Sequence, residues 1–119
     1  MKMTSGEKAF LKFIKDHHLP ISYTGDGKLW IGNRNPDFTH KTEQIVYEVF
    51  GKAFHTPDYG MFKHRPIPHR CTVDGTLNHY HEQGYQCIII WDYELVKRQK
   101  GRYNYLELPN RIKSKLGII

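Results

Sequence analysis

The segment 85–91 is a near-continuous apolar run that directly follows a glycine. Strands of this composition are typically covered on both faces, so we expect this one in the middle of a sheet. The residues before it, 74–83, have the pattern of a helix that Asp74 caps and Gly84 ends. A helix beside a strand that is buried on both faces requires layers above and below the sheet, which predicts an α/β fold.

A helix and a hairpin are predicted near the start of the chain. Thr4 and Glu7 fit a capping box, and apolar residues at helical spacing follow them, so we expect an amphipathic helix over 6–17. Short β-prone runs at 21–23 and 28–31 are separated by an Asp-Gly pair, which favours the positive backbone angles of a tight turn. These two runs are expected to form a β-hairpin.

The remaining segments complete a small mixed β-sheet flanked by helices. Strands are expected near 37–39, after a proline turn, and over 44–50. The segment 51–72 carries several prolines and histidines and little periodicity, which predicts a long loop of the kind often kept for function. Short helices are expected near 93–97 and over 110–116, with a basic linker between them. The length of 119 residues indicates one compact domain.

The charge balance favours a polyanionic partner. Lys and Arg number 18 against 12 Asp and Glu, which gives a net charge of +6. The basic residues concentrate around 63–70 and 97–102, and aromatic residues follow the second group, as in surfaces that bind nucleic acid. No apolar run approaches the roughly 20 residues of a membrane span, so we expect a cytoplasmic protein with no membrane partner. The two cysteines are then expected to be reduced.

Four acidic residues and one histidine are candidates for phosphodiester hydrolysis. This chemistry needs carboxylates that hold a hard cation, with a proton donor or acceptor nearby. Asp37 begins one predicted strand and Glu48 lies in the next, so adjacent antiparallel strands can bring their carboxylates together. His55 follows the second strand within reach of its end. Asp74 is the fourth acidic candidate. The other four candidates have a purely structural alternative: Asp37 as a turn residue, Glu48 as an exposed strand position, Glu7 as part of the capping box, and His55 as a solvated loop side chain.

Four pieces of the chain together resemble a known nuclease group. These pieces are 7–11, 35–38, 45–55 and 84–95, which carry an acid in the first helix, Pro-Asp-Phe, a strand that ends in Gly-x-x-x-His, and Gly-Tyr, strand, Trp-acid. Their spacing is similar to that of the very-short-patch-repair endonuclease group, a branch of the PD-(D/E)xK superfamily. The resemblance implies a restriction-endonuclease-like fold over about 6–95.

The same resemblance implies roles for individual residues. Phage intron-associated homing endonucleases within this group carry a Glu, Asp, His, Asp signature, which falls on Glu7, Asp37, His55 and Asp74. The resemblance implies that Asp37 binds catalytic Mg²⁺, with the backbone carbonyl of Val49, and that Mn²⁺ can substitute. Glu7 would orient a water held by the ion. His55 would transfer protons, and Asp74 would position its imidazole.

The chain departs from the group at several positions. Phe50 stands where the superfamily has the lysine of its (D/E)xK strand, so His55 must substitute for it. Of two aromatic residues that repair members place before the histidine, only Phe54 remains. Lys52 replaces a zinc-binding cysteine, and no paired CxxC spacing supports a structural zinc site elsewhere. Asp58 rivals Asp74 as the fourth signature residue, and Glu48 is a further candidate for the site.

These observations predict a Mg²⁺-dependent DNA endonuclease of the homing type. Its catalytic core is expected over 1–95, and the basic extension over 96–119 would lead to DNA-binding regions outside this chain. Double-stranded DNA is the expected partner, in a bacterial or phage-infected cell and near its nucleoid, and a long pseudo-symmetric target favours a homodimer. The residues expected to contact DNA are Lys52, Phe54, Lys63, Arg65, Arg70, Lys97, Arg98, Lys100 and Arg102. Two alternatives stay open: a catalytically silent DNA-binding module with a nuclease fold, and a nicking enzyme for mismatched duplexes.

Overall fold

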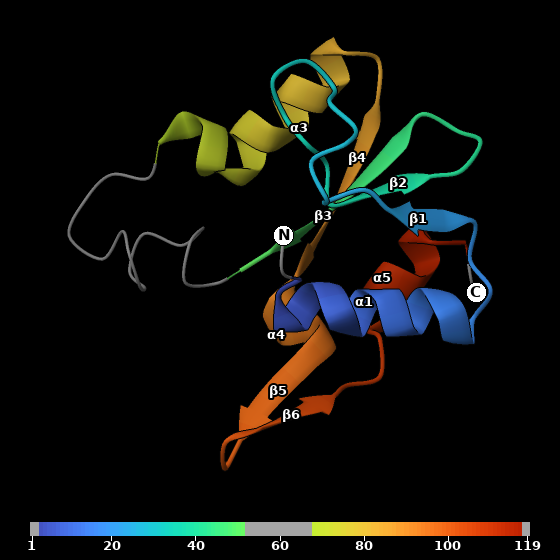
Figure 1. The fold of residues 1–119 in the computed structure, drawn as a ribbon, viewed down its shortest axis with the longest axis vertical. Coiled ribbons are helices and arrows are strands. Elements are labelled where there is room, and N and C mark those ends of the chain that lie inside the picture. Colours follow the sequence, from blue (N-terminus) through green and yellow to red (C-terminus); the bar gives the residue numbers. More distant parts are fainter. Residues whose placement is uncertain (1–2, 52–67, 118–119) are drawn as a thin grey trace.

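The computed structural model describes residues 3–51 and 68–117 and has a mixed α/β fold (Figure 1). The helices are α1 (Ser5–Asp16), α3 (Val73–Glu82), α4 (Asp92–Leu95) and α5 (Asn110–Lys115), with a short 3-10 helix at His69–Cys71. The strands are β1 (Ile21–Tyr23), β2 (Phe38–His40), β3 (Ile45–Phe50), β4 (Gln86–Trp91), β5 (Val96–Gln99) and β6 (Arg102–Tyr105). The helices predicted over 6–17, 74–83 and 110–116 and the strand over 44–50 are therefore confirmed, within one or two residues at most ends. No helix in the described ranges is long and apolar enough to cross a membrane.

Four strands form the main sheet in the order β1-β2-β3-β4. The pairs β1–β2 and β2–β3 are antiparallel, whereas β3 and β4 are parallel and α3 connects them. The prediction that β4 lies in the middle of the sheet is wrong, because in the described part of the chain it pairs only with β3 and lies at the edge. β4 is apolar because both of its faces are covered, although among the described residues it has a neighbouring strand on one edge only. Ile88 and Ile90 belong to one core cluster, and Cys87 packs against another.

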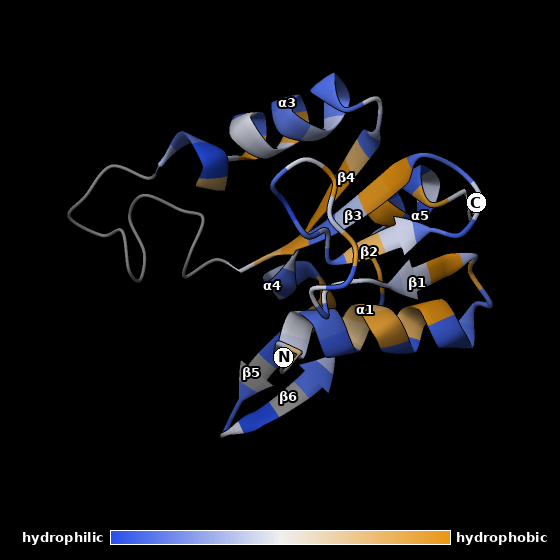
Figure 2. Cartoon of the chain, turned by 45° about the horizontal axis from the view of Figure 1, so that its top comes forward, coloured by the Kyte–Doolittle hydropathy of each residue, from blue (hydrophilic) through white to orange (hydrophobic). Residues whose placement is uncertain are grey.

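Helices cover both faces of this sheet. On one face, Phe10 of α1 lies edge-on against Phe38 of β2, with ring centroids 4.9 Å apart. Leu95 of α4 and Ile112 of α5 belong to the same cluster, so the basic extension contributes to the core that α1 covers. On the other face, Tyr80 of α3 packs against Val46 and Ile31. Figure 2 shows the apolar residues of the strands between these layers.

The hairpin predicted over 21–31 is wrong. β1 pairs with β2 instead, and residues 28–31 form no strand beyond a single bridge between Ile31 and Arg34. The side chain of Asn35 explains this difference, because its amide donates to the carbonyls of Thr24 (2.8 Å) and Leu29 (2.6 Å). Its oxygen accepts from the N–H of Gly27 at 3.2 Å. Asn35 thus holds the segment between β1 and β2 as a closed loop rather than as paired strands.

The predicted basic linker after α4 is a second β-hairpin. β5 and β6 pair antiparallel, with Gln99 opposite Arg102. Lys100 and Gly101 between them both have positive φ, at 51° and 77°, which is the geometry of a two-residue hairpin turn. Lys97, Lys100 and Arg102, expected to contact DNA, therefore lie on a hairpin that extends away from the main sheet (Figure 1).

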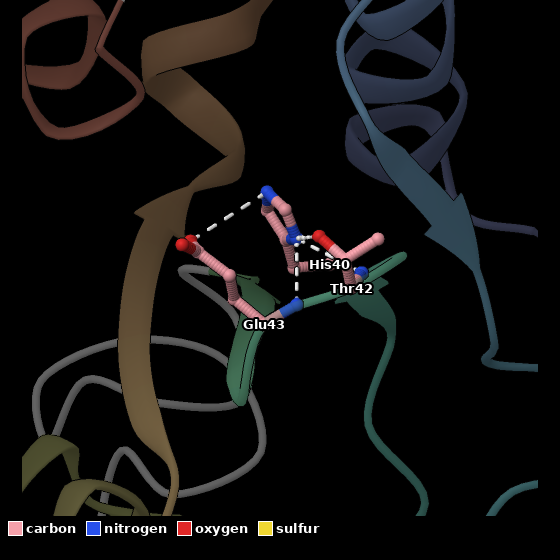
Figure 3. Close-up of polar contacts among 3 residues, drawn as sticks. All are labelled: His40, Thr42 and Glu43. Atoms are coloured by element: carbon pink, nitrogen blue, oxygen red, sulfur yellow. Dashed lines mark hydrogen bonds and ion pairs between the residues drawn. The ribbon is translucent and has the colours of Figure 1, made fainter.

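Two side chains fix the ends of individual elements. Thr72, not Asp74, caps α3, since its hydroxyl accepts from the N–H of Gly75 at 3.0 Å. His40 closes the turn between β2 and β3, where its Nδ1 accepts from the N–H groups of Thr42 (3.2 Å) and Glu43 (3.0 Å) (Figure 3). This turn sets the register that places Phe38 opposite Tyr47.

Candidate active site

A cavity of about 400 Å³ lies where the start of α1, the residue before β2, the end of β3 and the start of α4 meet. Among the described residues, its lining carries four carboxyl groups and one basic side chain. The lining residues are Thr4, Ser5, Glu7, Arg34, Asp37, Glu48, Val49, Phe50, Gly51 and Asp92. Four of the sequence candidates therefore come together from three separate segments of the chain. They are Glu7, Asp37, Glu48 and Val49.

Asp37 is the most strongly perturbed carboxyl group in this cavity. Its Oδ2 accepts a hydrogen bond from the backbone N–H of Val49 at 2.9 Å, and its carboxyl group shares a hydrogen bond with that of Glu48. Burial raises the pKa of Asp37 to about 9, and the negative charges of Glu48 and Glu7 act in the same direction. At neutral pH the Asp37–Glu48 pair therefore retains a proton.

Glu48 joins Asp37 because α3 covers this face of β3. Its side chain is buried, with 7% exposed, and its Oε1 accepts from the hydroxyl of Tyr80 at 2.5 Å. Tyr80 is fully buried, and burial and the charge of Glu48 both raise the pKa of its hydroxyl, which keeps it a donor. Glu48 lies on the same face of β3 as Val46, beneath Tyr80, so its structural alternative as an exposed position is wrong.

Glu7 serves the helix and the cavity at once. Its N–H donates to the hydroxyl of Thr4 at 3.2 Å, and its Oε1 accepts from the N–H of Thr4 at 3.1 Å, so the predicted capping box is confirmed. The neighbouring Gly6 brings α1 close to the end of β3. A Cβ at Gly6 would lie 2.9 Å from the Cβ of Asp92 and 3.0 Å from Cγ1 of Val49.

The Gly6→Ala substitution is expected to lower the free energy of unfolding by about 1–2 kcal/mol. The added methyl group must push α1 away from Asp92 and Val49, which costs about 1–3 kcal/mol, while the higher helix propensity of alanine returns part of this. Urea unfolding measures the change, with the exposed Lys8→Ala on the same helix as the control. A Gly6→Ala protein as stable as the control would contradict the close approach.

Other predicted site residues lie elsewhere. Asp74 is exposed in the first turn of α3 and does not line the cavity. Arg70 is exposed in the 3-10 helix and lines a different cavity. Arg98 lies in β5 by its backbone position. Five of the predicted site and DNA-contact residues lie outside the described ranges. His55 is one of them, so its pairing with Asp74 stays a prediction. The five are Lys52, Phe54, His55, Lys63 and Arg65, and the rival Asp58 lies there too.

Sequence reasoning missed Arg34. It is the only basic side chain among the described residues that line the cavity. Its Nη1 donates to the backbone carbonyl of Arg70 at 2.7 Å and its Nη2 to the hydroxyl of Thr76 at 3.0 Å. Its position three residues before Asp37 was the available signal, since a chain segment that delivers a carboxylate to a cavity can deliver a nearby side chain as well.

The oxygen donors of this cavity suit a hard divalent cation. Mg²⁺ is usually held by one or two carboxylates and keeps several waters. Asp37, Glu48 and the carbonyl of Val49 provide oxygen ligands of this type. Within 3–51 and 68–117, no group of three or more His, Cys, Asp or Glu side chains is already arranged to hold a metal ion. Comparisons with family models, curated proteins and solved structures found no match for this chain.

Proposed function

We propose that this chain is the catalytic domain of a Mg²⁺-dependent DNA endonuclease, similar to the homing enzymes of the very-short-patch-repair-like group. The observation that carries the proposal is the convergence of Glu7, Asp37 and Glu48, from three different elements, on one cavity beside Val49. A mixed sheet flanked by helices is also the kind of fold that the resemblance implies. The net charge of +6 suits a duplex DNA substrate.

The donor set of the cavity fits a divalent cation. Burial is the main cause of the raised pKa of Asp37, and the repulsion between Asp37 and Glu48 when both are ionised adds to it. With a bound cation this repulsion would be removed, and Asp37 and Glu48 would release their shared proton, because carboxylate ligands must be ionised to bind. Burial of Glu48 and its hydrogen bond from Tyr80 fix one oxygen of the pair in place.

The residues of the cavity have distinct roles in this proposal. When bound, Mg²⁺ neutralises charge on the phosphate and makes water a stronger nucleophile. Asp37, Glu48 and the carbonyl of Val49 would hold the ion, and the hydroxyl of Tyr80 holds Glu48 in place. Glu7 orients the attacking water. His55 transfers a proton to or from the reacting groups, a role that the resemblance alone supplies.

A second candidate function is a DNA-binding module without catalysis. Phe50 favours it, because this side chain is 2% exposed and stands where the superfamily has its lysine. Its ring lies edge-on to that of Trp91, with centroids 5.4 Å apart, so the position serves packing. Binding without Mg²⁺-dependent cleavage of plasmid DNA would favour this module over the endonuclease.

The test is cleavage of supercoiled plasmid by the purified protein in Mg²⁺, with EDTA as the blank. Glu7→Gln is expected to lower the cleavage rate by about 100-fold or more, as loss of a group that acts on the attacking water typically does. Glutamine keeps the capping box, so α1 and the fold are retained. Circular dichroism checks the fold. Cleavage by Glu7→Gln at the wild-type rate would contradict the role of Glu7.

A further inference from the structure

A second polar cavity, of about 250 Å³, lies beside the candidate active site. The loop that carries Arg34, the 3-10 helix at His69–Cys71 and helix α3 form its walls. Its functional side chains are mostly donors or cationic groups. In the described part of the chain they are Asn33, Arg34, His69, Arg70, Asn78, His79 and one acid, Glu82. With two arginines and one glutamate the cavity carries a net positive charge even when both histidines are neutral, which suits an anion.

Arg34 lines both this cavity and the one that holds Asp37. Its guanidinium is held in place by the hydrogen bonds to the carbonyl of Arg70 and the hydroxyl of Thr76, and it lies 5.8 Å from the ring centroid of Tyr80. A guanidinium has five N–H donors, and among the described residues these two bonds use one from each terminal nitrogen. The remaining donors can bind an anion in either cavity.

The loop that carries Arg34 is anchored to α3. The carbonyl of Ile31 accepts from Nε2 of His79 at 2.7 Å, and the N–H of Ile31 donates to the carbonyl of Arg34 at 2.8 Å. Gly32 has a positive φ of 64° and lies so close to His79 that a Cβ there would be 2.9 Å from its Cε1. The walls of the cavity are therefore preorganised, which lowers the cost of binding.

We propose that this second cavity binds a backbone phosphate of the strand being cut, next to the scissile one. Arg34 lies between the two phosphate positions, and Arg70 binds the second phosphate from the outer wall. Guanidinium groups form paired, charge-assisted hydrogen bonds with phosphate, so two of them hold a strand in a fixed direction. The DNA source of this phosphate rests on the proposed function, whereas the anion site itself follows from the lining of the cavity.

The first experiment uses inorganic phosphate in EDTA and follows the protein by NMR. The side-chain signals of His69, Asn78 and His79 are expected to shift and saturate as phosphate is added. Arg70→Gln is expected to weaken this binding, and Lys15→Gln, which removes the same charge from an exposed position of α1, is expected to leave it unchanged. Unmoved signals, or equal weakening by Lys15→Gln, would overturn the anion site.

The second experiment measures the affinity for a 20-base-pair duplex in EDTA over a range of salt concentrations, where nothing is cut. Arg70→Gln is expected to reduce the slope of log K against log salt by about 0.9, the value of one lost phosphate contact. An unchanged slope beside normal binding of inorganic phosphate would overturn DNA as the source. Absence of plasmid cleavage by the wild type would refute the endonuclease and leave both of these results interpretable, because neither depends on catalysis.

Discussion

Asp37→Asn is expected to abolish Mg²⁺-dependent DNA cleavage and, at the same time, to stabilise the metal-free protein at pH 8. Partners in the outer shell of a metal site typically contribute 10- to 100-fold in metal affinity or activity, so loss of a direct ligand should lower the cleavage rate by more than about 100-fold. The amide of asparagine can still accept from the N–H of Val49 and can donate to Glu48. The fold is therefore retained.

The stabilisation follows from the raised pKa of Asp37. Its pKa is about 9 in the folded protein and ordinarily 3.8, so the folded state binds this proton more tightly than the unfolded state. The resulting stability is complete below about pH 4 and is lost as the pH rises towards about 9. Each unit of a pKa difference corresponds to about 1.4 kcal/mol, so we expect Asp37→Asn to be more stable than the wild type by at least about 1 kcal/mol at pH 8.

Urea unfolding in EDTA at pH 4, 6 and 8 measures this effect. The difference between Asp37→Asn and the wild type is expected to increase with pH, whereas Asp26→Asn, which removes the same charge from an exposed loop position, is expected to show no such increase. A constant difference at all three pH values would mean that Asp37 is not a buried, proton-sharing carboxyl group. Cleavage at an undiminished rate by Asp37→Asn would remove it from the catalytic role.

The parts of the fold that the sequence predicts well are those determined by neighbouring residues. The capping box of Thr4 and Glu7 defines the start of α1, and the apolar residues of β3 predict a strand there. Asp37 also belongs to this class, because the proline before it fixes where β2 can begin. These signals need no knowledge of what packs against them.

The parts of the fold that the sequence does not predict depend on contacts with residues far along the chain. The Asp-Gly pair before β2 supports a tight turn in isolation, but hydrogen bonds to and from the side chain of Asn35 make the segment a closed loop. Glu48 is polar on a strand and looks exposed until Tyr80, 32 residues later, covers it. Arg34 enters the cavity through contacts with Arg70 and Thr76, which no spacing rule links to it. Tertiary contacts thus decide which polar residues face the site.

The Tyr80→Phe substitution tests the buried support beneath Asp37. The hydroxyl of Tyr80 donates to Oε1 of Glu48 at 2.5 Å, and Glu48 in turn shares a hydrogen bond with Asp37. Phenylalanine keeps the ring that packs against Val46 and removes only this donor. A buried carboxylate oxygen then lacks one partner, which costs about 1–3 kcal/mol, so the free energy of unfolding is expected to fall by this amount.

The Mg²⁺ dependence of cleavage shows whether Tyr80 positions the carboxylates or has a purely structural role. If the hydroxyl orients Glu48 for the metal site, Tyr80→Phe should raise the Mg²⁺ concentration for half-maximal cleavage by about 10-fold, as changes in the outer shell of metal sites do. Tyr47→Phe is the matched control. Tyr47 is buried like Tyr80, but it lies on β3 and packs against Phe10 on the opposite face of the sheet. Calorimetric titration with Mn²⁺ gives the same comparison without cleavage. Equal Mg²⁺ and Mn²⁺ requirements in the two variants would mean that Tyr80 stabilises the sheet and α3 without positioning the carboxylates, since of these two tyrosines it is Tyr80 whose hydroxyl bonds Glu48.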